Sequence, residues 1–342
     1  MIRPIYLALL GGAVTALSAS PAVADHGAAG TGGNSSGPLV GASAATMPEG
    51  KAAITLALTL AKPEDRSDAE LASLAGRHIH AHDQDHAEAY LLGLSYGLTD
   101  NLTLSASLPY VRRLAIHEGA HSHVGGQAIN GVVDRGNSVG LGDAALLAKW
   151  RFTGEHHHGW EAAVLAGLKL PTGSNTRVDA LGEMFETEHQ PGTGSWDPIL
   201  GLAASRPLPR GCIDLSVIYQ IATRGAHDTR LGDRAQAAIG LTWRLAGGQI
   251  DYHGEHHHDT GRGGATLDGV IELNGEWEGR QHESGTIDIY SGGKALFFSP
   301  GLRLTTGRWS FAVGGGVPVA QDIALSHPST RFRARFAIGR AL

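Results

Sequence analysis

Apolar and polar residues alternate along most of the chain. In the first clear run, Ile54, Leu56 and Leu58 would share one face of an extended segment. Thr55 and Thr59 would lie on the opposite face. A repeat of two residues predicts a β-strand with one apolar face, because successive side chains of a strand point to opposite sides.

The same alternation recurs to the end of the chain and predicts an all-β protein of about twelve antiparallel strands. Each run is long enough to cross a bilayer as a tilted strand, which takes roughly 9–11 residues. An even number of such strands is typical of outer-membrane barrels. The predicted strands lie near residues 51–62, 86–98, 101–114, 139–153, 160–170, 195–206, 212–223, 233–245, 266–278, 293–305, 308–319 and 330–341.

The polar faces of these strands carry many charges. The last strand alone places Arg331, Arg333 and Arg335 on one face, and three arginines cannot share the dry core of a sandwich. We therefore expect the polar faces to line a wet lumen, either as a pathway for solutes or as a network that compensates its own charges. The predicted lumen-lining residues are Asp143, Lys149, Glu161, Lys169, Asp214, Arg234, Arg244, Glu272, Arg303, Arg331, Arg333 and Arg335.

The connections between the predicted strands alternate in length, as the external loops and periplasmic turns of outer-membrane barrels do. Long connections are expected at 63–85, 115–138 and 171–194, and short turns at 99–100, 154–159 and 207–211. The turn at 246–265 is longer than this rule allows. With an even number of strands, both ends of the chain are expected in the periplasm.

Aromatic residues give a second test, because aromatic girdles flank the apolar band of membrane barrels. All six tryptophans fall on the apolar phase near the end of a predicted strand, whereas a soluble sandwich would bury them in the middle of its strands. They are Trp150, Trp160, Trp196, Trp243, Trp277 and Trp309.

The first fifty residues show no strand pattern. Arg3 precedes an apolar run that ends in Ala22-Val-Ala24 before Asp25, which is typical of a cleaved secretory signal. We predict a signal peptide at 1–24, a flexible leader rich in glycine and serine at 25–50, and a barrel at 51–342 that is exported to the bacterial outer membrane.

Composition narrows the classes of function. Charged residues make up 18% of the 342 residues, against about 25% in ordinary soluble domains. The single cysteine, Cys212, permits neither an internal disulfide nor a site with several cysteine ligands. The formal net charge of −6 gives no footprint for nucleic acid. The expected partners are outer-membrane lipids, the barrel assembly machinery and a small-molecule solute.

Several short motifs resemble those of the outer-membrane β-barrel family labelled "putative MetA-pathway of phenol degradation". The motifs are Gly140-Leu-Gly-Asp143, Lys169-Leu-Pro-Thr-Gly173, Gly194-Ser-Trp-Asp197, Ser299-Pro-Gly-Leu302 and Val317-Pro318. The resemblance covers about residues 50–342 and implies a channel for small hydrophobic or aromatic compounds. The chain departs from the family pattern by ending in Leu342 instead of an aromatic residue, by its long turn at 246–265 and by its histidine content.

Many of the nineteen histidines are clustered, two clusters in predicted external loops and two in predicted turns. Imidazole is the commonest neutral ligand of zinc, copper and nickel. We therefore keep open an alternative function, a metal-binding barrel for uptake, efflux or tolerance of Zn, Cu or Ni, although no cofactor is required. The candidate ligands are His78, His80, His82, His86, His117, His121, His123, His156, His157, His158, His256, His257 and His258.

An enzyme is not expected. A barrel enzyme that acts on lipids would need a serine or an acid beside a histidine on its outer face, and the alternation places no such pair there. The sequence therefore predicts passage of small molecules across the outer membrane.

Overall fold

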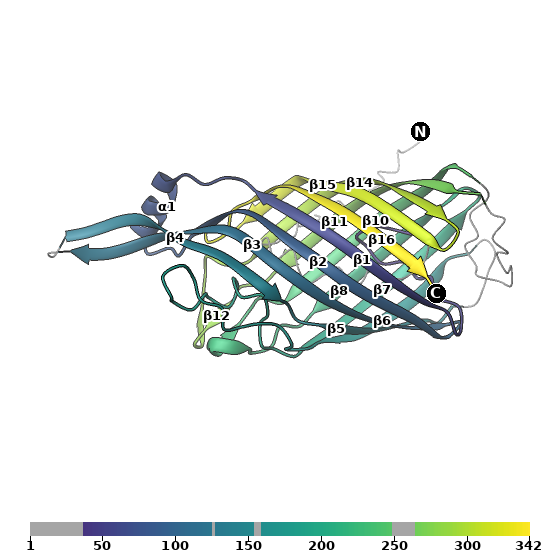
Figure 1. Ribbon diagram of the computed structural model, residues 1–342, viewed down its shortest axis with the longest axis horizontal. Helices are drawn as coiled ribbons and strands as arrows, with labels where there is room; N and C mark the ends of the chain where they lie inside the picture. The colour runs from purple at the N-terminus through teal and green to yellow at the C-terminus, as the bar shows by residue number, and fades with distance from the viewer. Residues whose placement is uncertain (1–36, 125–126, 154–158, 248–263) are drawn as a thin grey trace, which may run out of the picture.

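Twelve antiparallel strands close into a barrel (Figure 1). The computed structural model describes residues 37–124, 127–153, 159–247 and 264–342. Each barrel strand pairs with its neighbours along the chain, and β1 pairs with β16 to close the ring. The predicted fold is confirmed. The barrel strands are β1 (Ala52–Pro63), β2 (His82–Thr99), β3 (Leu102–Val124), β5 (Ala145–Arg151), β6 (Glu161–Lys169), β7 (Asp197–Leu208), β8 (Gly211–Gln220), β10 (Arg234–Ala246), β11 (Thr266–Glu278), β14 (Gly293–Thr306), β15 (Trp309–Ile323) and β16 (Thr330–Ala341).

The predicted long connection at 115–138 is instead part of a hairpin. Strand β3 runs on to Val124 and returns as β4 (Gln127–Leu141), which leads directly into β5. The first part of β3, residues 102–107, pairs with β5, and the rest, residues 110–124, pairs with β4. The β3–β4 hairpin projects beyond the barrel (Figure 1). Its residues face no lipid, so they lack the apolar alternation that revealed the barrel strands.

A short helix, α1 (Asp68–Ala75), packs beside this hairpin. The side chain of Ser67 caps the helix by accepting a hydrogen bond from the N–H of Glu70. Leu71 and Leu74 form a small buried cluster with Ile79. In the part of the chain that the structure describes, no helix is long and apolar enough to cross a membrane. The end of the barrel that carries α1 also holds η1 (Ala226–Asp228) and a small sheet of β9 (Thr229–Arg230), β12 (His282–Glu283) and β13 (Thr286–Ile287).

The barrel is apolar outside and polar inside. Leu202 on β7 is 61% exposed, whereas Asp214 and Glu272 on nearby strands are almost fully buried. This inversion of a soluble core matches a wall with lipid on one side and a polar lumen on the other. Five of the six tryptophans predicted for the aromatic girdles are exposed near strand ends, namely Trp150, Trp160, Trp196, Trp243 and Trp309, whereas Trp277 is only partly exposed and stacks on Tyr219.

The two ends of the barrel differ. Strand β1 begins beside the end of β16, where Ala53 pairs with Ala341. The tight turns β2–β3, β7–β8 and β14–β15 lie at this end, which we call the turn end and which the sequence predicts to face the periplasm. The opposite, loop end carries α1, the β3–β4 hairpin and the connection at 170–196.

We expect Leu202→Arg to destabilise the barrel by about 2–4 kcal/mol, because it places a charge against the middle of the bilayer. The matched control is Leu181→Arg, since Leu181 is also 61% exposed but lies in a loop-end connection. Urea unfolding in liposomes measures both. Equal effects of the two substitutions would contradict the assignment of a lipid-facing band.

Candidate functional site

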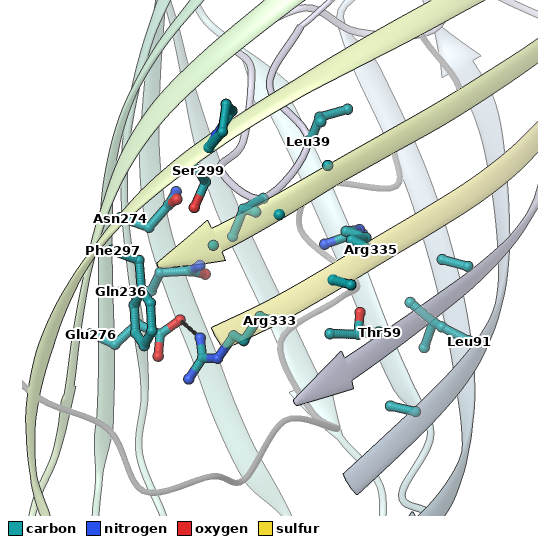
Figure 2. Close-up of a pocket in the computed structure, with 18 of the residues that line it drawn as sticks. Leu39, Thr59, Leu91, Gln236, Asn274, Glu276, Phe297, Ser299, Arg333 and Arg335 are labelled. Carbon is teal, nitrogen blue, oxygen red and sulfur yellow. Dashed lines mark hydrogen bonds and ion pairs between the residues drawn. The ribbon is translucent and has the colours of Figure 1, made fainter. Parts of the chain in front are cut away.

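The lumen contains part of the chain itself. Residues 37–48, here called the inner segment, are mostly buried and precede β1 from inside the barrel. This differs from the expected flexible leader at 25–50, and Figure 2 shows Leu39 of this segment beside the lumen residues. The rest of the leader, residues 25–36, and the predicted signal peptide lie outside the described residues.

The carboxylate of Glu272 holds one part of the inner segment. It accepts hydrogen bonds from the backbone N–H groups of Leu39, of Val40 at 3.1 Å and of Gly41 at 2.9 Å. Three successive N–H groups directed at one oxyanion form a nest, and hydrogen bonds to a charged acceptor are stronger than neutral ones. Glu272 is fully buried, so this nest supplies much of its compensation.

Other lumen side chains bind the backbone of the same segment. Arg303 donates to the carbonyl oxygens of Gly37 at 2.7 Å and Pro38 at 3.2 Å. Lys149 donates to the carbonyl of Ser43 at 3.1 Å. Hydroxyl groups from three strands accept hydrogen bonds from backbone N–H groups of the segment. The pairs, hydroxyl first, are Ser216–Ala42, Ser205–Ala44 and Thr103–Met47.

Small residues allow the segment to lie this close to the wall. A Cβ on Gly41 would come within 2.8 Å of the Cβ of Ala238. Leu39 packs where β14 and β15 carry Gly301 and Gly314, and a Cβ at either glycine would collide with it. The composition that suggested a flexible leader therefore also permits close packing in the lumen.

The remaining lumen charges largely compensate one another. Lys169 lies 3.0 Å from Asp143 and 2.8 Å from Asp197. Arg151 pairs with Glu161 at 3.5 Å, and Arg244 pairs with the carboxylate of Asp268. A ladder of free charges is not present among these groups. The predicted lumen residues that are buried are Asp143, Lys149, Glu161, Lys169, Asp214, Arg234, Arg244, Glu272 and Arg303.

The three arginines of β16 separate in the structure. Arg333 donates to Glu276 at 2.6 Å, and its guanidinium lies 4.0 Å from the ring centre of Phe297. Arg335 is partly buried, and Figure 2 draws it with Arg333 among the residues that line the pocket. Arg331 is exposed at the loop end, 3.8 Å from Asp65. Of these three arginines of β16, Arg333 and Arg335 therefore line the lumen cavity, and Arg331 does not.

A cavity of about 110 Å³ lies beside the inner segment (Figure 2). Apolar side chains from three parts of the chain line it, namely Leu39, Leu91 and Phe297. Arg333 and Glu276 supply a paired polar group on its wall, and Arg234 and Glu278 supply a second one. On β15 the wall consists of three glycines, residues 314–316, which leave the cavity its space.

The described histidines of each predicted metal-ligand cluster contact different partners in the structure. His82 is buried, His80 lies 3.8 Å from Glu118, and His86 contacts Asp85 at 2.7 Å. Elsewhere His78 and His121 stack edge to face, and His117 lies 3.9 Å from Asp134. The runs at 156–158 and 256–258 lie outside the described residues, as does the side chain of His123.

A different histidine cluster lies at the loop end of the lumen. His82 meets His189 and His327, with ring centres 4.3 and 4.9 Å apart, and the carboxylate of Glu188 lies among them. Burial lowers the pKa of His327 to about 4 and that of His189 to about 3. Burial and neighbouring acids raise the pKa of Glu188. His189 and His327 each stand alone in the sequence, so no local pattern marked them as members of a cluster.

Two short sequences match enzyme motifs, but their backbone context differs. His117, Glu118 and His121 have the spacing of a zinc-protease motif, which requires a helix to bring both histidines to one metal. Here they lie on β3, where residues four apart are about 13 Å apart. A Gly-x-Ser-x-Gly run around Ser95 lies within β2 instead of at a strand-to-helix turn.

Comparisons with known proteins agree with the fold. Residues 63–270 match the family described as "Putative MetA-pathway of phenol degradation". The crystal structure of an outer membrane channel from Pseudomonas putida F1 is similar to this chain, with 18% identity, a TM-score of 0.57, and coverage of 87% of this chain and 97% of that one. A comparison with curated proteins finds no match.

Two further solved structures are similar at lower scores. The CymD monoaromatic hydrocarbon channel has 9% identity and a TM-score of 0.38, with coverage of 86% of this chain and 88% of that one. LpxR from Salmonella typhimurium has 13% identity and a TM-score of 0.38, with coverage of 84% and 99%.

We expect Lys169→Met to cost about 3–5 kcal/mol of unfolding free energy, because it leaves Asp143 and Asp197 buried without their cation. The matched control is Lys294→Met, which breaks the exposed pair with Asp322 and should cost no more than about 1 kcal/mol. Denaturant unfolding compares them. A cost for Lys169→Met as small as that for Lys294→Met would contradict the structural role of this cluster.

Proposed function

The chain belongs to the family described as "Putative MetA-pathway of phenol degradation", and on this basis we propose that it is an outer-membrane channel for small hydrophobic molecules, including aromatic ones. Its apolar outer face contacts outer-membrane lipids, and its insertion uses the barrel assembly machinery. The solute is the partner that the lumen cavity accommodates.

The lumen cavity carries this proposal. Its volume of about 110 Å³ is comparable with an apolar cavity of about 150 Å³ that accommodates benzene. Leu39, Leu91 and Phe297 provide apolar contact. The Arg333–Glu276 pair provides a hydrogen-bonding group at one side, where an aromatic solute with a hydroxyl group could be oriented.

The inner segment is the part that must move for a solute to pass. It crosses the lumen and is held through its backbone by side chains of the barrel wall. Water can replace such hydrogen bonds, each of which contributes about 1.5–3 kcal/mol net because one partner is charged. We propose that displacement of this segment opens the route from the cavity toward the turn end.

Two other functions have less support. The similar protein from Pseudomonas putida F1 is an outer membrane channel, in line with a protein that is not an enzyme. The metal-transport alternative is not favoured, because no histidine is among the described residues that line the cavity beside the inner segment, and the described histidine clusters lie at the loop end.

Filling the cavity tests its role in solute passage. Thr59 lines the cavity, and we expect Thr59→Phe to lower the uptake of a small aromatic hydrocarbon severalfold by occupying this space. The matched control, Thr59→Val, keeps the side-chain volume and should retain uptake. Uptake of radiolabelled toluene by cells that express each variant at equal levels is the measurement. Unchanged uptake with Thr59→Phe would contradict the proposed route.

Loosening the inner segment tests its role as the barrier. Glu272→Gln removes the charge that three backbone N–H groups share. We therefore expect a larger single-channel conductance and more frequent openings in planar bilayers. Glu276→Gln is the control, because Glu276 also lies in the lumen but pairs with Arg333 instead of the inner segment. Conductance of Glu272→Gln no higher than that of the control would overturn the barrier assignment.

A further inference from the structure

We propose that His82, Glu188 and His327 form a binding site for one divalent transition-metal ion of the zinc type at the loop end of the lumen. Local clustering did not reveal this site, because its members come from three separate parts of the chain. His82 is the first residue of β2, Glu188 lies in the connection between β6 and β7, and His327 lies in the connection between β15 and β16. The inference is independent of the solute proposed above.

The carboxylate of Glu188 lies between the two imidazoles. Its Oε1 is 3.3 Å from Nδ1 of His82, and its Oε2 is 3.6 Å from Nε2 of His327. One ligand atom from each of the three residues lies within 4.8 Å of the others. Tetrahedral zinc with bonds of about 2.0–2.2 Å places its ligands about 3.3 Å apart. Small side-chain movements would therefore close the group around one ion.

The two imidazoles contact each other, with Nδ1 of His327 3.2 Å from Nε2 of His82, but one oxygen of the carboxylate between them lacks a partner. His82 and His327 are 5% and 6% exposed. Oε2 of Glu188 is buried and accepts no hydrogen bond from the residues that the structure describes. A buried carboxylate oxygen without a partner is costly, and a bound cation would satisfy it. Nε2 of His189 lies 3.8 Å from Oε1 of Glu188 and could support the site from its edge.

The backbone that carries the ligands is held in place by other side chains. Arg66 donates to the carbonyl oxygens of Leu325 at 2.7 Å and His327 at 2.6 Å. Ser138 donates to the carbonyl of His189 at 2.6 Å. Fixed ligand positions of this kind are typical of metal sites, whose outer contacts orient the ligands.

Charged groups of both signs surround the cluster. Arg66 is directed to backbone carbonyls, as is Arg113, which donates to the carbonyl of Gln190 at 3.2 Å. The carboxylates of Glu278, Glu283 and Asp288 lie near enough to Glu188 to raise its pKa, and Glu278 is itself paired with Arg234 at 3.0 Å.

The site also has room for an open coordination position. His82, Glu188 and His327 line a cavity of about 40 Å³, and a water molecule needs roughly 10–15 Å³ of such space. Three protein ligands plus one water is a common arrangement for zinc. A metal bound here would join the start of β2 to two connections at the loop end of the lumen.

Cobalt binding tests the site directly, because Co²⁺ in a tetrahedral protein site absorbs visible light far more strongly than hydrated octahedral Co²⁺. The assay uses the full barrel in detergent, with asparagine in place of the histidines at 156–158 and 256–258 to remove background binding. We expect one equivalent of Co²⁺ to give the tetrahedral spectrum, and added Zn²⁺ to abolish it.

Glu188→Gln and His327→Asn in this background should each lose the tetrahedral spectrum. The matched control is His121→Asn, at the same end of the barrel but hydrogen-bonded to Asn130, which should keep it. Heat-modifiable gel mobility confirms that each variant is folded. The proposal is overturned if the folded parent shows no tetrahedral spectrum, or if the spectrum survives both ligand substitutions.

Discussion

The hydrogen-bond demand of a buried backbone is the constraint on which the lumen depends. An irregular segment inside a barrel carries N–H and C=O groups that must find partners. The wall supplies those partners as charged and hydroxyl side chains. Glu272 accepts hydrogen bonds from the N–H groups, and Arg303 donates hydrogen bonds to the C=O groups. In return the segment compensates charges that would otherwise be buried alone. The inner segment and the lumen charges therefore require each other.

This mutual satisfaction explains what sequence analysis could and could not predict. The strands were predictable because lipid on one face and polar groups on the other impose a repeat of two along every strand. The position of residues 37–48 was not, because its contacts use backbone atoms and its side chains are small. A segment of glycine, alanine and serine has the same composition whether it is flexible or packed. The β3–β4 hairpin was missed for a related reason, since it lies beyond the lipid and shows no apolar face.

The histidines show the limit of reasoning from local density. Clusters along the sequence drew attention to neighbours such as His78 and His80, which the structure leaves apart from one another. The compact group combines His82 with Glu188 and His327, which are more than 100 residues apart along the chain. Only the closure of the barrel brings their connections to one place, so no local sequence pattern could have identified the group.

The cavity is bounded by two structures of different strength, and this difference indicates which one yields. At the loop end, arginines bind backbone carbonyls of two connections, and Lys169 binds two carboxylates at the base of one of them. Removing one partner from such a group leaves a buried charge, so these contacts resist separation. The inner segment is anchored chiefly through its backbone, and water can take over those bonds as the segment leaves. Movement of the inner segment leaves the ion pairs of the barrel wall intact, and the water that replaces the segment must then solvate Glu272 and Arg303.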